Sequence, residues 1–229
     1  MNLAIDIGNT AVKWATFEGR TLVAHGDNEK KLANLVEQAD NMLACASGKM
    51  PTLGEHLPVL NSNTHLPIKL DYKTPETLGA DRIADACGAW SLHPGEACLI
   101  IDAGTCITID YLDGDGVYHG GAIMPGLGMN LQALHTFTAK LPLVSLDGVE
   151  KAPVLGRSTE ESIVAGTLGT TMLALAGYVA LYKQKSPSLQ VLLTGGDAPR
   201  LTAAGATGWE HVPQLTLIGL NEIIIHNEK

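Results

Sequence analysis

The sequence predicts an α/β protein built from two duplicated lobes. Strand-like and helix-like patterns alternate along the 229 residues, which is typical of this class. An apolar strand that ends in Asp-x-Gly and leads into a second strand occurs twice, at Asp6 and at Asp102. Hydrophobic residues make up 45% of the chain, so there is enough apolar side chain for a sizeable core.

The first half of the chain predicts strands, one helix, a further strand and then a second helix. Ile83, Ala86, Cys87 and Trp90 recur at helical spacing and define that second helix. The expected elements are strands near 2–8, 11–17 and 21–25, a helix near 28–38, a strand at 41–47, a stretch rich in Pro and Asn at about 50–75, and a helix from about 80.

After "HPGEA" the pattern starts again. "CLIIDAG" is an apolar strand, "TCITIDYL" alternates like a half-buried strand, and "DGDG" is a strong hairpin turn. The remaining elements are expected to be a strand at 117–124, a helix after Pro125, a polar linker near 145–157, a helix at 159–184, a strand at 189–196, a short helix from about 197 and an amphipathic C-terminal segment.

The repeat also predicts where the two lobes divide. Each Asp-x-Gly strand is followed by a second strand and, after a similar interval, by a turn glycine, Gly19 or Gly114. We therefore expect an N-terminal lobe over 1–94 and a C-terminal lobe over 95–229.

Charge and cysteine content exclude several classes of protein. The formal net charge of −9 disfavours nucleic acid and anionic membranes as partners. Cys45, Cys87, Cys98 and Cys106 lie in apolar segments without a CxxC pair, which indicates reduced, buried thiols in a cytoplasmic protein. The N-terminus has the pattern of a strand and lacks that of an export signal.

The segment 162–182 carries no charged residue and is long enough to cross a bilayer. Its glycines and threonines equally suit a buried helix that packs closely through small side chains. The second interpretation is favoured because no positive charge precedes the segment nearby, so no membrane partner is expected.

The Asp-x-Gly turns can bind an anion through backbone N–H groups, since glycine leaves room for close approach. An aspartate beside a phosphate requires a cation between them, which suggests a nucleotide with a divalent ion. One such turn alone is better explained by Asp6 as a turn former, and it is the second copy that favours the nucleotide. Lys13 fits a phosphate contact or simple solvation at a strand edge.

Two further motifs have a chemical and a structural interpretation. "VLLTGGD" (191–197) offers a glycine shelf for an adenosine, or a strand-to-helix turn with Asp197 as N-cap. In "LGADR", Asp81 can accept a proton from a substrate hydroxyl, or it can stabilise the first turn of a helix. Arg82 can bind a substrate carboxylate or amide, or form an ion pair. Neither a P-loop nor a GxGxxG sequence occurs.

Taken in order, these motifs resemble those of type III pantothenate kinases, within the superfamily of acetate and sugar kinases, chaperones and actin. The motifs are DIGNT (6–10), LGADR (78–82), DAGT (102–105), GGAIMPG (120–126), GRSTEESI (156–163) and TGG (194–196). The resemblance covers nearly the whole chain. It implies two ribonuclease H-like (actin-like) lobes with a nucleotide cleft between them.

The implied reaction is ATP-dependent phosphorylation of pantothenate to 4'-phosphopantothenate, the first step of coenzyme A biosynthesis. ATP, Mg²⁺ and a monovalent cation, K⁺ or NH₄⁺, are the implied cofactors, and the protein is expected to be a homodimer through residues 120–126. Two alternatives stay open: a non-catalytic nucleotide-binding regulator of the same fold, or a phosphatase or kinase acting on another substrate.

The resemblance also assigns roles to individual residues. Asp81 is the implied catalytic proton acceptor, Asp102 would hold the monovalent cation, and Asp6 would position Mg²⁺ through water. The implied nucleotide-binding residues are Asp6, Ile7, Gly8, Asn9, Thr10, Ala11, Val12, Lys13, Thr105, Gly195 and Gly196. The implied pantothenate-binding residues are Tyr72, Gly79, Ala80, Asp81, Arg82 and Thr159.

Some of these positions carry a second interpretation or depart from the family. Ser158 and Glu161 can form a capping box around Thr159. Residues 120–126 also fit a strand that leads into a helix with Pro125 near its start. The second loop continues with Cys106 and Ile107 where the family usually has Ala-Thr, so fewer hydroxyls surround it.

Overall fold

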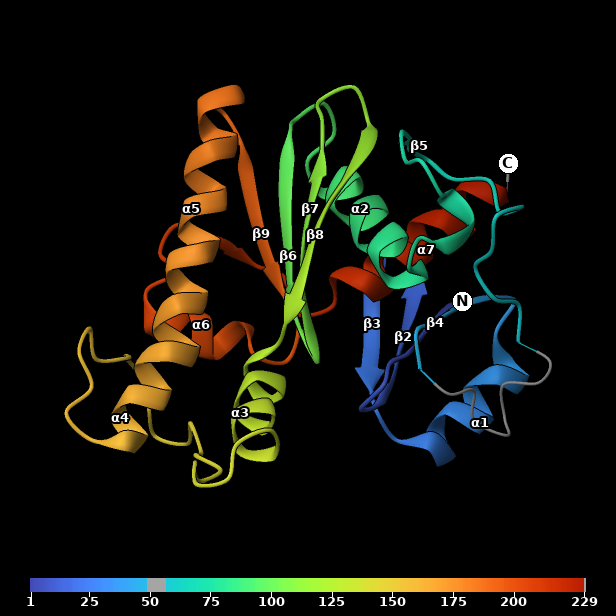
Figure 1. The fold of residues 1–229 in the computed structure, drawn as a ribbon. Helices are drawn as coiled ribbons and strands as arrows, with labels where there is room; N and C mark the ends of the chain where they lie inside the picture. The colour runs from blue at the N-terminus through green and yellow to red at the C-terminus, as the bar shows by residue number, and fades with distance from the viewer. Residues whose placement is uncertain (49–56, 229) are drawn as a thin grey trace. The chain divides into compact units, whose positions relative to one another are not determined.

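The computed structural model describes residues 1–48 and 57–228, which form a mixed α/β fold (Figure 1). The predicted elements are confirmed over these residues, with ends shifted by a few positions. The structure adds two short strands, β5 (Lys69–Leu70) and β10 (Glu210–His211), and a 3-10 turn, Pro75–Thr77. Part of the Pro- and Asn-rich stretch lies outside the described residues.

Two sheets and seven α-helices are present in the described residues. The strands are β1 (Asn2–Ile7), β2 (Val12–Glu18), β3 (Thr21–Gly26), β4 (Asn41–Ala46), β5 (Lys69–Leu70), β6 (Cys98–Ala103), β7 (Cys106–Leu112), β8 (Val117–Pro125), β9 (Gln190–Thr194) and β10 (Glu210–His211). The helices are α1 (Glu29–Gln38), α2 (Ala80–Leu92), α3 (Leu127–Thr136), α4 (Thr159–Val164), α5 (Thr170–Lys185), α6 (Ala198–Ala204) and α7 (Leu215–Asn227).

The chain divides into two compact units. Unit 1 comprises Met1–Cys98, Asp110–Gly120 and Gln214–Lys229, and unit 2 comprises Leu99–Ile109 and Gly121–Pro213. These units are composed differently from the predicted lobes 1–94 and 95–229, because the C-terminal segment and part of β7 and β8 belong to unit 1. The division into lobes at residues 94 and 95 remains a prediction from the sequence.

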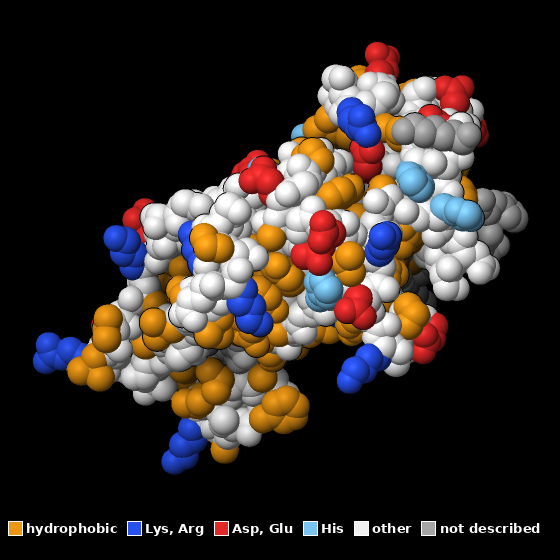
Figure 2. Space-filling view, turned by 90° about the horizontal axis from the view of Figure 1, so that it is seen from above, with side chains coloured by type: hydrophobic (Ala, Val, Ile, Leu, Met, Phe, Trp, Pro, Cys, Tyr) orange, Lys and Arg blue, Asp and Glu red, His pale blue; other side chains and the backbone are white. Residues whose placement is uncertain are grey.

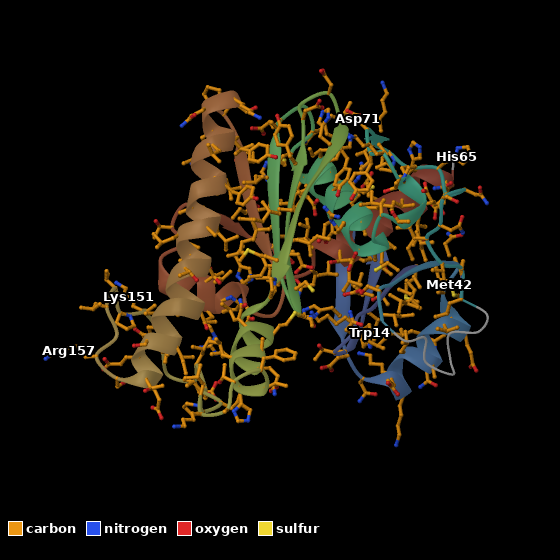
Figure 3. The ribbon with its side chains drawn as sticks, viewed as in Figure 1. Trp14, Met42, His65, Asp71, Lys151 and Arg157 are labelled. Atoms are coloured by element: carbon orange, nitrogen blue, oxygen red, sulfur yellow. The ribbon has the colours of Figure 1, made fainter. Side chains whose placement is uncertain are left out.

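In unit 1, a four-stranded sheet has the order β3-β2-β1-β4. Strand β1 is antiparallel to β2 and parallel to β4, and this register places Asp6 opposite both Lys13 and Cys45. Its apolar face forms a core that includes Ile5 and Trp14. Trp14 extends from β2 toward the start of α1 (Figure 3), where its indole N–H donates to the Asn28 carbonyl oxygen at 3.3 Å.

Helices α2 and α7 pack against one another in unit 1 (Figure 1). Glycines make the close approach possible: a Cβ at Gly88 would lie 2.6 Å from the Leu215 carbonyl oxygen, and a Cβ at Gly219 would overlap the Ala84 carbonyl group. Helix α7 also packs on β1 and β4 and is buried along most of its length. The prediction of an amphipathic C-terminal segment is therefore wrong, because α7 is buried in the core of unit 1.

The second sheet has the order β10-β9-β6-β7-β8-β5. The hairpin between β7 and β8 turns at Gly116, whose φ of 74° favours glycine. Gly114, the turn glycine predicted from the sequence, is not one of the described glycines with a positive φ. It packs close to the Gly95 backbone instead.

One continuous helical segment, Thr159–Lys185, runs through α4, a π-helical turn at Ala165–Gly169 and α5 (Figure 1). It is long and apolar enough to cross a membrane by length and composition, and 39% of its most apolar window is buried. One such helix among the described residues is weak support for a membrane span, because core helices share these properties.

All four cysteines are free thiols, and three of them are buried. Cys106 is exposed, so the expectation that every thiol is buried is wrong there. The reason is its position at the first residue of β7, directly after the second Asp-x-Gly turn, where the strand has not yet entered the core.

Candidate active site

The first predicted nucleotide loop lies in unit 1 between β1 and β2. The Gly8 N–H donates to the Ala11 carbonyl oxygen at 3.1 Å, which closes the turn. The backbone N–H groups of Ser47 and Gly48 both donate to the Ile7 carbonyl oxygen, at 3.1 and 2.9 Å. The turn is thus fixed from behind by the end of β4, and it presents the exposed residues Asn9, Thr10 and Ala11.

The other residues of this loop divide into inward and outward side chains. Ile7 is fully buried and Val12 packs against the same core, so their side chains are structural and only their backbone faces the loop. Lys13 is exposed and pairs across the sheet with Asp6, which puts both side chains on one face.

Asp6 is a half-buried carboxylate with a specific set of neighbours. The Cys45 thiol donates to Oδ1 of Asp6 at 3.3 Å. Burial raises the pKa of Asp6, the Cys45 bond and the Lys13 charge oppose this effect, and the negative charge of Asp81 raises the pKa further. The charge of Asp81 therefore acts on Asp6 within unit 1, although the two residues are 75 positions apart in the sequence.

Asp81 stands in the first turn of α2, as predicted, and it is half-buried. Its Oδ1 accepts the N–H of Arg82 at 2.9 Å. A Cβ at Gly79 would lie 2.5 Å from this oxygen, so the glycine before the helix gives the carboxylate room to turn back over the helix start. Gly79 and Ala80 are themselves half-buried beside it.

Arg82 is buried and pairs with Asp110, which confirms the ion-pairing interpretation and excludes a surface position. Its Nε lies 3.0 and 3.2 Å from the two Asp110 oxygens, and its Nη2 lies 2.5 Å from Oδ1. The Tyr118 hydroxyl donates to the same Oδ1 at 2.7 Å. The ring of Tyr72, a predicted substrate residue, lies 6.0 Å from the guanidinium carbon.

Asp110 and Tyr118 are not among the site residues predicted from the sequence. Asp110 was visible as a charged residue inside the apolar strand "TCITIDYL", where a buried carboxylate needs a partner. No local pattern shows which residue provides that partner. Only the tertiary contact between Asp110 on β7 and Arg82 on α2 does so.

The second predicted loop lies in unit 2 between β6 and β7. The Gly104 N–H donates to the Cys106 carbonyl oxygen at 3.0 Å, so this turn is tighter than the first. Strands β1 and β6 have the same burial pattern, with Asp6 and Asp102 each half-buried one residue before the end. Thr105 is exposed at the turn, as Thr10 is in unit 1.

The TGG segment packs against the end of β6 in unit 2. The Asp197 N–H donates to the Ala103 carbonyl oxygen at 2.9 Å. Gly195 has a φ of 91°, and a Cβ there would lie 2.5 Å from the same oxygen and would overlap the Asp102 carboxylate. Glycine is therefore required at 195, and unit 2 brings Asp102 beside Gly195, with Gly196 exposed next to it.

Asp197 stands at the N-cap position of α6, as the structural interpretation predicted. In the described part of the chain its side chain makes no capping hydrogen bond. Burial raises its pKa, and the nearby Arg200 opposes this effect.

Thr159 begins α4 in unit 2 and is exposed. The predicted cap is present: Ser158 Oγ accepts the Glu161 N–H at 3.1 Å. The Glu161 carboxylate reaches back to the Arg157 N–H at 2.6 Å, one residue before the position that a standard capping box uses. The preceding segment projects Lys151 and Arg157 outward (Figure 3).

Across residues 1–48 and 57–228, no group of three or more His, Cys, Asp or Glu side chains could hold a metal ion. Asp6 and Asp102 each offer a single, half-buried carboxylate at the end of a strand. Single hard oxygen donors fit a cation that takes its other ligands from phosphate oxygens and water, as Mg²⁺ does in phosphoryl-transfer sites.

Comparison with solved structures shows the fold class. A Sinorhizobium meliloti protein provisionally assigned as a 2-dehydro-3-deoxygalactonokinase has a TM-score of 0.55 at 13% identity, covering 97% of this chain and 98% of its own. A Listeria monocytogenes protein provisionally assigned as an N-acetylmannosamine kinase has a TM-score of 0.54 at 14% identity, covering 100% and 99%. These likenesses show the fold, and the predicted α/β, ribonuclease H-like class is confirmed.

Sequence comparison defines the family within that class. The family model for type III pantothenate kinase matches residues 33–181. Type III pantothenate kinases of Bacteroides fragilis and Phocaeicola vulgatus are 42% and 39% identical, and the matches cover 86% and 100% of this chain and the same shares of theirs. The chain belongs to the type III pantothenate kinase family.

A Campylobacter jejuni structure provisionally assigned as a Baf family transcriptional activator has a TM-score of 0.63 at 22% identity, covering 99% of this chain and 98% of its own. At this identity the likeness again shows the fold alone.

Proposed function

We propose that this protein transfers the γ-phosphoryl group of ATP to the terminal hydroxyl of pantothenate, giving 4'-phosphopantothenate in the first step of coenzyme A biosynthesis. The observation that supports it best is that the chain belongs to the type III pantothenate kinase family. Unit 1 also has an acid at the end of β1, Asp6, and another in the first turn of α2, Asp81. A kinase needs one acid for the nucleotide side and another for the acceptor hydroxyl.

In the proposed mechanism Asp81 accepts the proton of the pantothenate hydroxyl as the phosphoryl group arrives. Its position suits this role, since it is half-buried and turned over the helix start. Phosphoryl transfer requires little covalent assistance, so positioning and neutralisation of charge supply most of the catalysis. Mg²⁺ would neutralise phosphate charge when bound, and Asp6 would orient its water ligands.

The proposed nucleotide contacts of unit 1 are the Asp6–Lys13 segment, with backbone N–H groups and the Lys13 ammonium facing phosphate. Those of unit 2 are Thr105 and the Gly195–Gly196 shelf. Asp102 would hold the monovalent cation, K⁺ or NH₄⁺. The close approach of the Gly195 backbone to the Asp102 carboxylate supports this, because carboxylate and backbone carbonyl oxygens can together coordinate a cation.

Tyr72, Gly79, Ala80 and Arg82 form the proposed pantothenate contacts of unit 1, with Arg82 directed at the carboxylate. Thr159 is the residue of unit 2 that we propose contacts pantothenate. Its side chain is exposed at the start of α4, so it can bind a ligand while Ser158 caps the helix.

We also propose a cytoplasmic homodimer through residues 120–126. In unit 2, Ile123 is 62% exposed and Phe137 is 85% exposed, while Leu173 and Leu181 on α5 are 75% and 58% exposed. Figure 2 shows exposed hydrophobic side chains on the lower left of the drawn face, with Lys and Arg side chains around them. Large apolar areas of this kind are typical of interfaces. The substitution Ile123→Glu should convert a dimer to a monomer in light scattering, whereas a wild-type monomer would contradict the proposal.

The kinase is tested with purified protein, ATP, Mg²⁺ and pantothenate, first with K⁺ and then with Na⁺. Formation of ADP together with 4'-phosphopantothenate, identified by mass, is expected. Absence of ADP under every salt would contradict the proposal. Nucleotide binding without turnover would support the non-catalytic regulator, and phosphate release without an acceptor would support a phosphatase.

A further inference from the structure

We infer that Asp110 and Tyr118 are positioning residues that hold Arg82 in the orientation needed to bind the carboxylate of the acceptor. This inference rests on the proposed function and deepens it. The observation is a chain of buried contacts within unit 1, which runs from Tyr118 through Asp110 to Arg82, the residue next to the proposed proton acceptor Asp81.

The geometry of the pair fixes the plane of the guanidinium group. Asp110 accepts from Nε and from Nη2 of Arg82, which together form one edge of the planar group. A two-point contact of this kind prevents rotation about the last bonds of the side chain. Nη1 takes no part in the bonds to Asp110, and the Tyr72 side chain also hydrogen-bonds to Arg82. An acceptor carboxylate would therefore meet the guanidinium beside Tyr72.

Tyr118 in turn fixes Asp110. The phenol is fully buried, and burial, together with the Asp110 charge, raises its pKa, so the hydroxyl stays protonated and donates to Oδ1 at 2.7 Å. Asp110 is 1% exposed, so its orientation is set by these two partners. Burial alone would lower the pKa of Arg82, but the Asp110 bond and charge outweigh it, and the pKa stays raised.

Strand β8 also places Tyr72 over the guanidinium. A Cβ at Gly120 would lie 2.8 Å from Cε2 of Tyr72, so glycine lets this ring settle against β8. The rings of Tyr72 and Tyr118 lie 6.1 Å apart, and the Tyr72 ring lies 6.0 Å from the Arg82 guanidinium carbon. The planar cation is therefore held at one edge by Asp110 and faced by Tyr72.

Stability alone is a weak reason for this arrangement. Two charges buried together lose their hydration, and such a pair often stabilises a fold no more than apolar side chains of the same volume. Orientation of an arginine beside the acceptor site gives the pair a purpose that apolar side chains could not serve.

The test compares two acceptors in two variants. Asp110→Asn removes the charge, and Tyr118→Phe removes only the hydroxyl. The acceptors are pantothenate and pantothenol, in which an alcohol replaces the carboxylate. KM is measured for each, or the inhibition constant against pantothenate if pantothenol is not phosphorylated. Asp115→Asn, an exposed aspartate of the same hairpin, is the matched control.

We expect Asp110→Asn to raise KM for pantothenate by roughly 10- to 100-fold and Tyr118→Phe by about 3- to 10-fold, the range of one lost charged or neutral hydrogen bond. Neither should change the value for pantothenol more than about 2-fold, because no carboxylate meets Arg82 there. A purely structural role would weaken both acceptors equally, and that result would overturn the inference, as would an unchanged KM for pantothenate.

Thermal unfolding shows whether Asp110→Asn is folded. If it is not, the acceptor selectivity of Tyr118→Phe decides the question. Wild-type protein that forms no ADP with pantothenate would overturn the proposed function and the inference with it. Active wild-type protein with unselective variants would overturn the inference alone.

Discussion

The thiol of Cys45 donates a hydrogen bond to the carboxylate of Asp6, with 3.3 Å between Sγ and Oδ1. Parallel pairing of β1 with β4 puts the two residues opposite one another. Cys45 is fully buried, and burial raises the pKa of its thiol well above the ordinary value, so it stays a protonated donor. A cysteine that the sequence indicated as core packing thus orients the first acid of the site.

The role of this thiol is checked with two substitutions. Cys45→Ser keeps a donor and should stay within about 2-fold of wild-type kcat/KM for ATP, whereas Cys45→Val removes the donor and should lose about 3- to 10-fold, the worth of one neutral hydrogen bond. Steady-state kinetics at varied Mg²⁺ measure the effect. Equal activity of the two variants would show that the thiol only fills space.

Asp81→Asn should reduce kcat by roughly 10²- to 10⁴-fold, because the amide cannot accept the hydroxyl proton. Folding should be retained, since the Asn oxygen can still accept the Arg82 N–H that Asp81 accepts now. Turnover is compared with Glu76→Gln, a neutralised acid at an exposed position just before α2. A variant with near-normal turnover would remove Asp81 from the proton-acceptor role.

Gly219→Ala should destabilise unit 1, because the new Cβ would overlap the Ala84 carbonyl group where α7 crosses α2. Overpacking of this kind costs about 1–3 kcal/mol in the free energy of unfolding. Gly128→Ala is the control, since a Cβ in that position of α3 meets open space, and it should be neutral or stabilise by up to about 1 kcal/mol. Denaturant unfolding measures both variants, and equal stability would contradict the packing argument.

The side chain of His119 should make the stability of unit 1 depend on pH. Its Nδ1 lies 3.1 Å from Asp71, which follows β5 (Figure 3), and its Nε2 lies 2.7 Å from Asp113. The Asp113 bond raises the pKa of His119 above its ordinary 6.5, although burial opposes it. Burial acts to raise the pKa of Asp113, but bonds from His119, Val117 and Asp115 hold it below 3.8.

The direction of the pH effect follows from these shifts. A raised histidine pKa stabilises the fold fully below pH 6.5, and this contribution is lost as the pH rises through the folded value. A lowered carboxylate pKa stabilises it above pH 3.8, and this contribution is lost as the pH falls through the folded value. The stability difference between wild type and His119→Gln should therefore be largest between these limits and shrink above pH 6.5. A difference that stays constant as the pH rises above 6.5, through the folded pKa of His119, would contradict the ion pairs.

Much of this protein is encoded locally. Apolar runs, the hairpin turn "DGDG" and helical spacing around Ile83 were enough to predict the strands and helices, because alternation and turn chemistry act over a few residues. The Asp-x-Gly repeat likewise predicted two strands that end alike, and β1 and β6 do have the same burial pattern. The position of Asp81 in the first turn of its helix followed from the same local signals.

Tertiary structure decided what those elements meet. The partner of Arg82 is 28 positions away, and the Asn2 side chain bonds to Asn221, 219 positions away, so neither contact leaves a local sequence signal. The C-terminal helix looked amphipathic, yet it is buried in unit 1, because α2, β1 and β4 cover it on several sides at once. The sequence by itself determined which residues end strands and begin helices. Only the packing of distant segments decided that a thiol supports Asp6 and a buried carboxylate holds Arg82, since burial and pairing depend on neighbours that the chain brings together by folding.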